Sequence, residues 1–216
     1  MCNNWPDYLI SVWNALGGLI GNTVLICGGS GYVDECYSLT SEKATLVTHM
    51  SVGRSGATSL VLNANTLWVT GGYNVIFLAS TEYITMTGTM PGPDLPMALE
   101  NHAMVAINST CTIVIGGFDG ISNYASTFFY DRNEGEWITG PSLMQARYWH
   151  AAGIVTDEVT DEHIIAVVGG FGFIAVAGGY GSGYSLDSTE MLQDGEWNQG
   201  KINNATCHFQ FFLTFS

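Results

Sequence analysis

Four short apolar runs recur along the chain, and each ends in a pair of glycines. The runs are TVLIC, TLWVT, CTIVI and IIAVV, followed by Gly28–Gly29, Gly71–Gly72, Gly116–Gly117 and Gly169–Gly170. Successive pairs begin 43, 45 and 53 residues apart. Each run is rich in β-branched residues and closes in a turn signal, as is typical of a buried strand. The pattern therefore predicts four copies of one β-rich unit.

The other parts of the unit recur in step with the glycines. A polar-to-aromatic strand follows each pair, as DECYSL, STEYIT, STFFYD or, without an aromatic residue, STEMLQ, and Trp137 and Trp197 follow in the last two units only. A further strand then opens at Ala57, His102, His150 or His208. The residues three positions earlier are Arg54, Leu99, Arg147 and Ala205. We therefore expect four antiparallel strands per unit, called a to d, with strand b ending in the glycine pair and strand d carrying the tryptophan.

This order of glycine pair, aromatic strand, Trp and Arg-x-x-His resembles the Kelch-repeat family, from about Asn14 to the end of the chain. The resemblance implies an all-β fold, a Kelch-type β-propeller with four four-stranded blades and a stub of a fifth. After an N-terminal segment 1–13, the approximate blades are residues 14–50, 54–97, 100–144, 148–202 and the partial 205–216. The resemblance to Kelch propellers implies a ring of six or seven blades. Four blades and a stub fall short of this number, so we expect an incomplete ring.

The chain departs from the family pattern in three ways. The first two units lack the tryptophan, and Leu99 and Ala205 replace arginine. The fourth unit is long, with an acidic insertion, TDEVTDEH, between strands a and b and a second glycine-pair segment, FIAVAGGYGSG. Because of these departures, a role known for a Kelch residue can be assigned only to positions of this chain that keep the family's residue type.

Composition narrows the class of partner. Hydrophobic residues make up 47% of the chain, enough for a buried core, while 19 acidic and 5 basic residues give a net charge of −14. This deficit of Lys and Arg argues against nucleic acid and against an anionic membrane surface. The charge-free stretch from Ile164 to Leu186 contains glycine pairs, which favour short strands over a membrane span.

The cysteines and the N-terminus leave the compartment open. Cys27 and Cys36 end one expected strand and begin the next, which fits either a disulfide or two small buried residues. Asn108 and Asn204 lie in possible N-glycosylation sequons. The first residues lack the features of a signal peptide. An adaptor-like protein would be cytoplasmic, whereas a chain lacking its true N-terminus could be extracellular.

We predict no catalytic, metal or cofactor site. His102, His150 and His208 share one repeat position, but stacked sheets lie ~10 Å apart and two nitrogen ligands of one zinc at most ~4 Å apart. Backbone hydrogen bonding is the expected role of these histidines. The segments GGSGY and GGYGSGYS lack the lysine and the helix of a phosphate-binding loop. The alternative function is a propeller fragment of a galactose-oxidase-like or sugar-modifying enzyme whose catalytic residues lie outside this chain.

The remaining candidates are loop residues at one end of the expected sheets. Because strand direction alternates, the b–c and d–a loops emerge on the same face. The b–c loops hold Tyr32, Tyr73, Phe118, Asp119 and Phe171, and the d–a loops hold Arg54, Arg147, Tyr148 and Trp149. Aromatic residues and arginine dominate binding hot spots. We therefore expect a non-catalytic protein-interaction scaffold that binds a partner protein or peptide through this face.

The two arginines have two possible roles. Resemblance to intracellular Kelch adaptors implies that Arg54 and Arg147 bind an acidic peptide motif. The alternative is a structural arginine that bonds loop carbonyls or the carboxylate of a neighbouring blade. The opposite face, with Asn22, Asn65, Asn108 and the stretch Asp157–Glu162, suits solvent.

Overall fold

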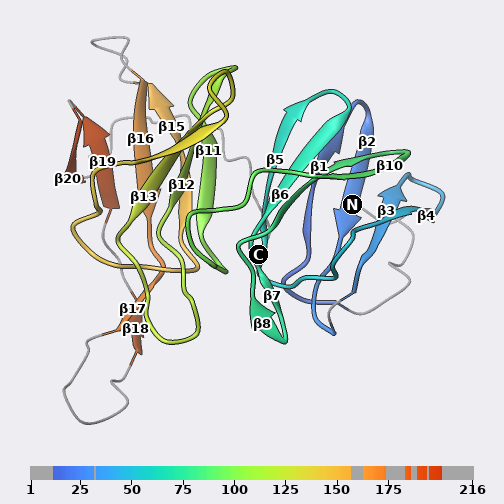
Figure 1. The fold of residues 1–216 in the computed structure, drawn as a ribbon, viewed down its shortest axis with the longest axis horizontal. Helices are drawn as coiled ribbons and strands as arrows, with labels where there is room; N and C mark the ends of the chain where they lie inside the picture. The colour runs from blue at the N-terminus through green and yellow to red at the C-terminus, as the bar shows by residue number, and fades with distance from the viewer. Residues whose placement is uncertain are drawn as a thin grey trace. The chain divides into compact units, whose positions relative to one another are not determined.

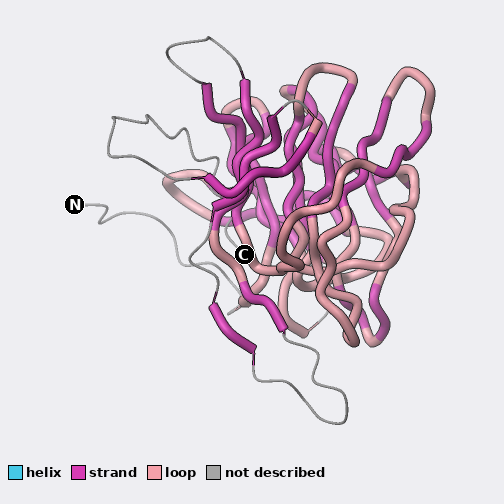
Figure 2. Tube along the Cα trace, turned by 90° about the vertical axis from the view of Figure 1, so that its left-hand side faces the viewer, coloured by secondary structure: helices cyan, strands magenta, loops and turns pink. Residues whose placement is uncertain are grey.

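The computed structural model describes residues 12–31, 33–156, 163–173, 183–185, 189–193 and 195–200. Within these ranges the regular structure is entirely β, so the expected all-β class is confirmed (Figures 1 and 2). Several predicted features lie outside them: Tyr32, the stretch Asp157–Glu162, Asn204, Ala205, His208 and the expected fifth-blade strand 205–216.

Sixteen strands form four antiparallel four-stranded sheets, as the repeat predicts. Sheet 1 contains β1 (Leu16–Ile20), β2 (Thr23–Cys27), β3 (Glu35–Leu39) and β4 (Ala44–His49). Sheet 2 contains β5 (Thr58–Asn63), β6 (Thr66–Thr70), β9 (Thr81–Thr85) and β10 (Gly88–Pro91). Sheet 3 contains β11 (Ala103–Ala106), β12 (Cys111–Ile115), β13 (Thr127–Asp131) and β14 (Glu136–Thr139). Sheet 4 contains β15 (Ala151–Thr156), β16 (His163–Val168), β19 (Thr189–Gln193) and β20 (Glu196–Gly200).

Two small hairpins that the repeat did not predict occupy b–c connections. One pairs β7 (Tyr73–Asn74) with β8 (Ile76–Phe77) in the b–c connection of sheet 2. The other pairs β17 (Phe171–Phe173) with β18 (Gly183–Ser185) in the b–c connection of sheet 4. Each hairpin projects beyond one end of its own sheet (Figure 1). The b–c connections are therefore structured extensions of the repeat.

The chain divides into two compact units, with the boundary between Glu100 and Asn101. Sheets 1 and 2 form the first unit, and sheets 3 and 4 the second. In each unit, buried side chains from both sheets form one core. The first core includes Leu25, Cys27, Leu67, Val69 and Ile84. The second includes Ala103, Ile113, Ile115, Ile165, Val167 and Trp197. On strand b, every second residue belongs to the core, as the alternation of side chains along a strand requires.

The first strands of sheets 1 and 2 approach each other closely. Ser59 Oγ on β5 donates a hydrogen bond to Gly17 O on β1 at 2.8 Å. A Cβ atom on Gly18 would lie 2.6 Å from Val61 Cγ2 and 2.8 Å from Leu67 Cδ1. Glycine at position 18 is therefore what lets the two sheets pack at this distance.

Cys27 and Cys36 form a disulfide between β2 and β3, so the structure adopts the first of the two interpretations left open by the sequence. Both residues are fully buried and directly opposite each other in the strand register. At the equivalent positions of strands b and c, sheet 2 has Thr70 opposite Thr81 and sheet 3 has Ile115 opposite Thr127. The disulfide thus replaces an ordinary cross-strand pair in sheet 1.

We expect reduction of this disulfide to destabilise the protein. A crosslink between residues nine apart restricts the unfolded chain, an effect on the order of 2–3 kcal/mol for so short a loop. Urea unfolding with and without dithiothreitol should show this as a lower midpoint in the reducing sample. A Cys27→Ala/Cys36→Ala variant should lose the response to dithiothreitol, whereas Cys111→Ala should keep it. An unchanged midpoint for the wild type would contradict the stabilising role.

Candidate binding face

Arg54 lies in the d–a loop between β4 and β5, and its side chain is fully buried. Its Nη1 donates hydrogen bonds to Gly71 O and Ser80 O, both at 2.8 Å, and its Nη2 donates to Glu82 Oε1 at 2.6 Å. Glu82 Oε2 also accepts a bond from Ser51 N at 2.7 Å. Burial lowers the pKa of the Arg54 guanidinium, while the charge of Glu82 acts in the opposite direction. The ion pair joins the loop to strand c of sheet 2.

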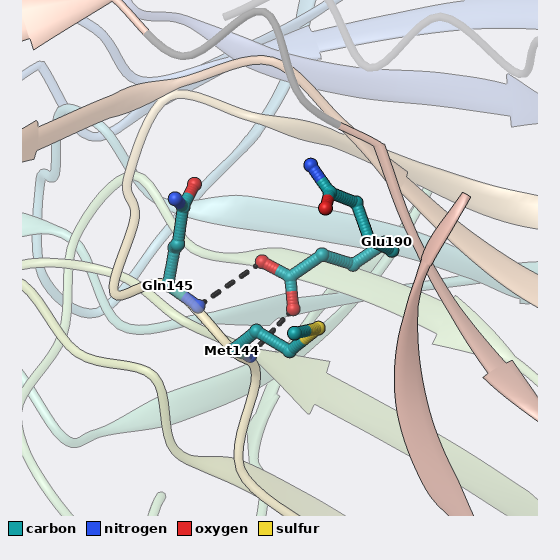
Figure 3. A pocket seen from close by; sticks show the side chains of 4 residues that line it. Met144, Gln145 and Glu190 are labelled. Atoms are coloured by element: carbon teal, nitrogen blue, oxygen red, sulfur yellow. Dashed lines mark hydrogen bonds between the residues drawn. The ribbon is translucent and has the colours of Figure 1, made fainter. Parts of the chain in front are cut away.

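Arg147 makes the same arrangement in sheet 4. Its Nη1 donates to Gly169 O at 2.7 Å, and its Nη2 donates to Glu190 Oε1 at 2.5 Å. Met144 N and Gln145 N also donate to the Glu190 carboxylate, at 2.5 and 3.2 Å (Figure 3). A pocket of about 130 Å³ borders this carboxylate. Because Glu190 is already bonded to a guanidinium and two amides, its carboxylate serves the fold and is not poised for catalysis.

These contacts favour the structural role of Arg54 and Arg147 over the partner-binding role, the two alternatives that the sequence left open. Both side chains are 0% exposed, and each is paired with a carboxylate of its own sheet. A guanidinium in this position cannot reach a partner without breaking a buried ion pair. The structural role is therefore the one that the geometry supports.

A signal for this ion pair was present in the sequence and was missed. The two paired glutamates belong to the STE segments of strand c, whereas sheet 3 has STF there, with Phe128 in place of glutamate. Sheet 3 is also the one preceded by Leu99 instead of arginine. Arginine and glutamate are thus present together or replaced together, as expected for two charges that compensate each other in the interior.

The arginine position also links successive sheets through its backbone. Gly29 N, in sheet 1, donates to Arg54 O at 2.9 Å, and Gly117 N, in sheet 3, donates to Arg147 O at 2.9 Å. The first glycine of each pair has φ between 60° and 71°, in the left-handed region. A Cβ atom on Gly116 would lie 2.5 Å from Arg147 O. The glycine pairs are therefore needed where one sheet meets the loop that leads into the next.

Four aromatic residues of the second unit form what we call the aromatic cluster: Phe118, Tyr148, Trp149 and Phe171. The Tyr148 ring centroid lies 5.3 Å from Phe118, 5.0 Å from Trp149 and 6.1 Å from Phe171. Trp149 and Phe171 meet edge to face at 5.6 Å and are 46% and 37% exposed. The structure thus brings together four aromatic residues that the sequence placed on the b–c and d–a loops.

The remaining candidates have separate locations. Asp119 Oδ1 accepts bonds from Ile121 N and Ser122 N, and Asp119 Oδ2 accepts one from Tyr124 Oη. Partial burial raises the pKa of the Asp119 carboxyl, but these bonds outweigh it and hold the pKa below its usual value. Tyr73 belongs to the other unit, where its ring lies 4.9 Å from that of Phe77. Asn108 is exposed in the a–b turn between β11 and β12.

Exposed large apolar residues of the described ranges fall into two groups. The first group lies on strands of the four-stranded sheets: Leu19, Leu46, Val61, Met90, Ile138 and Ile154. The second lies in b–c connections, in d–a connections or just before β1: Trp13, Val75, Ile76, Ile121, Met144, Trp149 and Phe171. The described a–b and c–d turns carry none. In each unit, the exposed apolar loop residues therefore lie at the end of its sheets where the sequence predicted binding loops.

His102 and His150, at the openings of strands β11 and β15, are buried in the second unit. Burial lowers the pKa of each imidazole to about 3, and for His150 the charge of Arg147 adds to the effect. No three His, Cys, Asp or Glu side chains of the described ranges gather in a way that could hold a metal ion. Because both pKa values lie far below 7, both imidazole rings are neutral at physiological pH.

The part of the chain that the structure describes contains no helix long and apolar enough to cross a lipid bilayer. No protein-family model matches the chain, and no curated protein matches its sequence. The fold and the loop face define an all-β repeat protein whose four-stranded sheets are consistent with the blades of a propeller.

Removing one partner of a buried ion pair should be far more damaging than removing both. Arg147→Leu leaves the Glu190 carboxylate buried and uncompensated, which we expect to reduce the free energy of unfolding by about 3–5 kcal/mol. Arg147→Leu/Glu190→Phe copies the residues that sheet 3 carries and should lose clearly less than the sum of the two single variants. Chemical denaturation of the four proteins measures this difference. Strictly additive losses would contradict the proposed coupling.

Stability should also fall in mild acid. Since the folded pKa of His102 and His150 is about 3 and the unfolded value about 6.5, the unfolded chain alone binds protons between these values. Going from pH 7.5 to 5.5 should therefore cost about 1.4 kcal/mol per histidine. A His102→Gln/His150→Gln variant should show a flatter dependence. Burial also raises the pKa of Glu100 to about 7, which stabilises the folded state over the same pH range, so the test is the difference between the two proteins: identical pH dependence in the wild type and the variant would refute the assignment.

Proposed function

We propose that this chain is a Kelch-type propeller domain that acts as a non-catalytic scaffold and binds a protein or peptide through the end of its sheets formed by the b–c and d–a connections. The family assignment is supported by the fourfold order of glycine pair, strand c and arginine position in the sequence. It is further supported by the four antiparallel sheets that carry this order.

The distribution of exposed apolar side chains carries the proposal. Loops facing water have no structural need for Val75 at 71%, Ile121 at 88% or Trp149 at 46% exposure. These residues lie at one end of their sheets, whereas the described a–b and c–d turns carry no exposed large apolar side chain. Exposed apolar groups on the loops at one end of a sheet are the kind of surface that binds a partner.

The partner's chemistry differs from what the sequence first suggested. An acidic motif was expected because Arg54 and Arg147 were placed on the loop face, but both guanidiniums are buried in ion pairs. Aromatic and aliphatic contacts remain as the source of affinity on this face. We therefore propose a peptide or protein partner that is held by the aromatic cluster.

Selection from a displayed peptide library, followed by affinity measurements, tests this proposal. Trp149→Asn removes the most exposed ring of the aromatic cluster, so peptides selected by the wild type should bind this variant at least tenfold more weakly. Ile138→Ser removes a side chain that is 59% exposed on β14, outside the loop face, and serves as the matched control. Equal binding to wild type and Trp149→Asn, or loss of binding in the control, would refute the proposed face.

A further inference from the structure

The aromatic cluster is held rigidly by backbone hydrogen bonds. Tyr148 N donates to Phe171 O at 3.1 Å, and Phe171 N donates to Tyr148 O at 2.8 Å. Trp149 N donates to Asn101 O at 2.9 Å. These bonds fix the segments that present the rings before any ligand arrives, which reduces the entropy lost on binding.

Trp149 occupies a backbone conformation that its side chain disfavours. Its φ is 53°, and the equivalent positions two residues before the other first strands are Asn14, Gly56 and Asn101, with φ of 54°, 61° and 53°. Asparagine and glycine tolerate this left-handed region, whereas a bulky residue there is an outlier. Strained residues of this kind concentrate at functional sites. Asparagine at position 149 would fit this backbone conformation equally well. The presence of an indole there therefore needs a reason other than the fold.

The charges around the aromatic cluster favour a positive ligand. The described residues of the second unit contain six carboxylates but only two cations, Arg132 and Arg147. Arg147 is paired with Glu190, and Arg132 donates to Ser109 O and Thr112 Oγ1 beside the a–b turn, at the other end of the sheet. Asp119, next to Phe118, is ionised at neutral pH. Whole-chain charge is −14, so an acidic ligand would be repelled.

We infer that the aromatic cluster binds the cationic side chain of an arginine or lysine in a partner peptide, against the exposed parts of the Trp149 and Phe171 rings. Aromatic rings attract cations through their quadrupole, and tryptophan attracts them most strongly. Among the cations, arginine takes part in such contacts more often than lysine. The inference deepens the proposed function and rests on it. Charge complementarity to the acidic chain selects this occupant over a neutral one.

Fluorescence polarisation with three labelled peptides tests the inference. The peptides share one short glycine-serine sequence and differ at two positions, which carry arginine, its neutral isostere citrulline, or glutamate. We expect the arginine peptide to bind at least tenfold more tightly than the citrulline peptide and the glutamate peptide not to bind. Raising sodium chloride from 50 to 500 mM should lower the affinity for the arginine peptide, since the attraction is partly electrostatic.

Trp149→Asn provides the matched variant, because asparagine occupies the same repeat position at Asn14 and Asn101. This variant should keep or raise the unfolding temperature and lose at least tenfold affinity for the arginine peptide, while Ile138→Ser should change neither. Undiminished binding by Trp149→Asn would show general attraction to an acidic chain and would overturn the inference.

Two further outcomes separate this inference from the proposed function. Equal binding of the arginine and citrulline peptides, both lost in Trp149→Asn, would overturn the cation preference while leaving the loop face as the docking surface. Binding of a neutral oligosaccharide such as cellohexaose at Trp149, without binding of the arginine peptide, would overturn both.

Discussion

In sheets 2 and 4, a buried ion pair between a loop arginine and a strand c glutamate fixes the incoming loop to the sheet. Arg54 and Glu82 in sheet 2, and Arg147 and Glu190 in sheet 4, join the incoming loop to the sheet that follows it. The carbonyl of each arginine accepts a bond from the glycine pair of the preceding sheet. One residue thus connects two sheets through its two ends. Such a pair is tolerated in the interior because backbone amides and carbonyls also bond to both side chains.

The same interaction determines what remains at the surface. With two of the three arginines buried, the loop face loses the positive groups that an acidic ligand would need. What this face presents instead is aromatic and aliphatic, in a strongly acidic chain. The strained Trp149 is the clearest example, since its left-handed backbone is needed by the fold but its indole is not. Structure and proposed recognition are therefore separated: the arginines stabilise the fold, and the aromatic rings are the residues that we propose for binding.

Much of the fold could be predicted from the sequence. The glycine pairs mark positions that need positive φ or close approach, and the alternation on strand b marks the core, so four four-stranded sheets followed directly. The small β7–β8 hairpin could not be predicted, because Val75 at its tip is a β-branched residue in the left-handed region. The burial of Arg54 was missed for another reason. Its partner Glu82 lies 28 residues away, and the joint replacement by Leu99 and Phe128 in sheet 3 has meaning only once the strand register is known.

Hydrogen exchange of the arginine side chains tests the central claim most directly. The chain has only three arginines, so ¹⁵N-resolved guanidinium signals can be assigned by substituting each residue in turn. The account predicts that the Nη protons of Arg54 and Arg147 exchange slowly with water, because they are buried and bonded to carboxylates and carbonyls, while those of the half-buried Arg132 exchange fast. If all three guanidiniums exchanged equally fast, Arg54 and Arg147 would be surface groups and the ion pairs would not exist in solution.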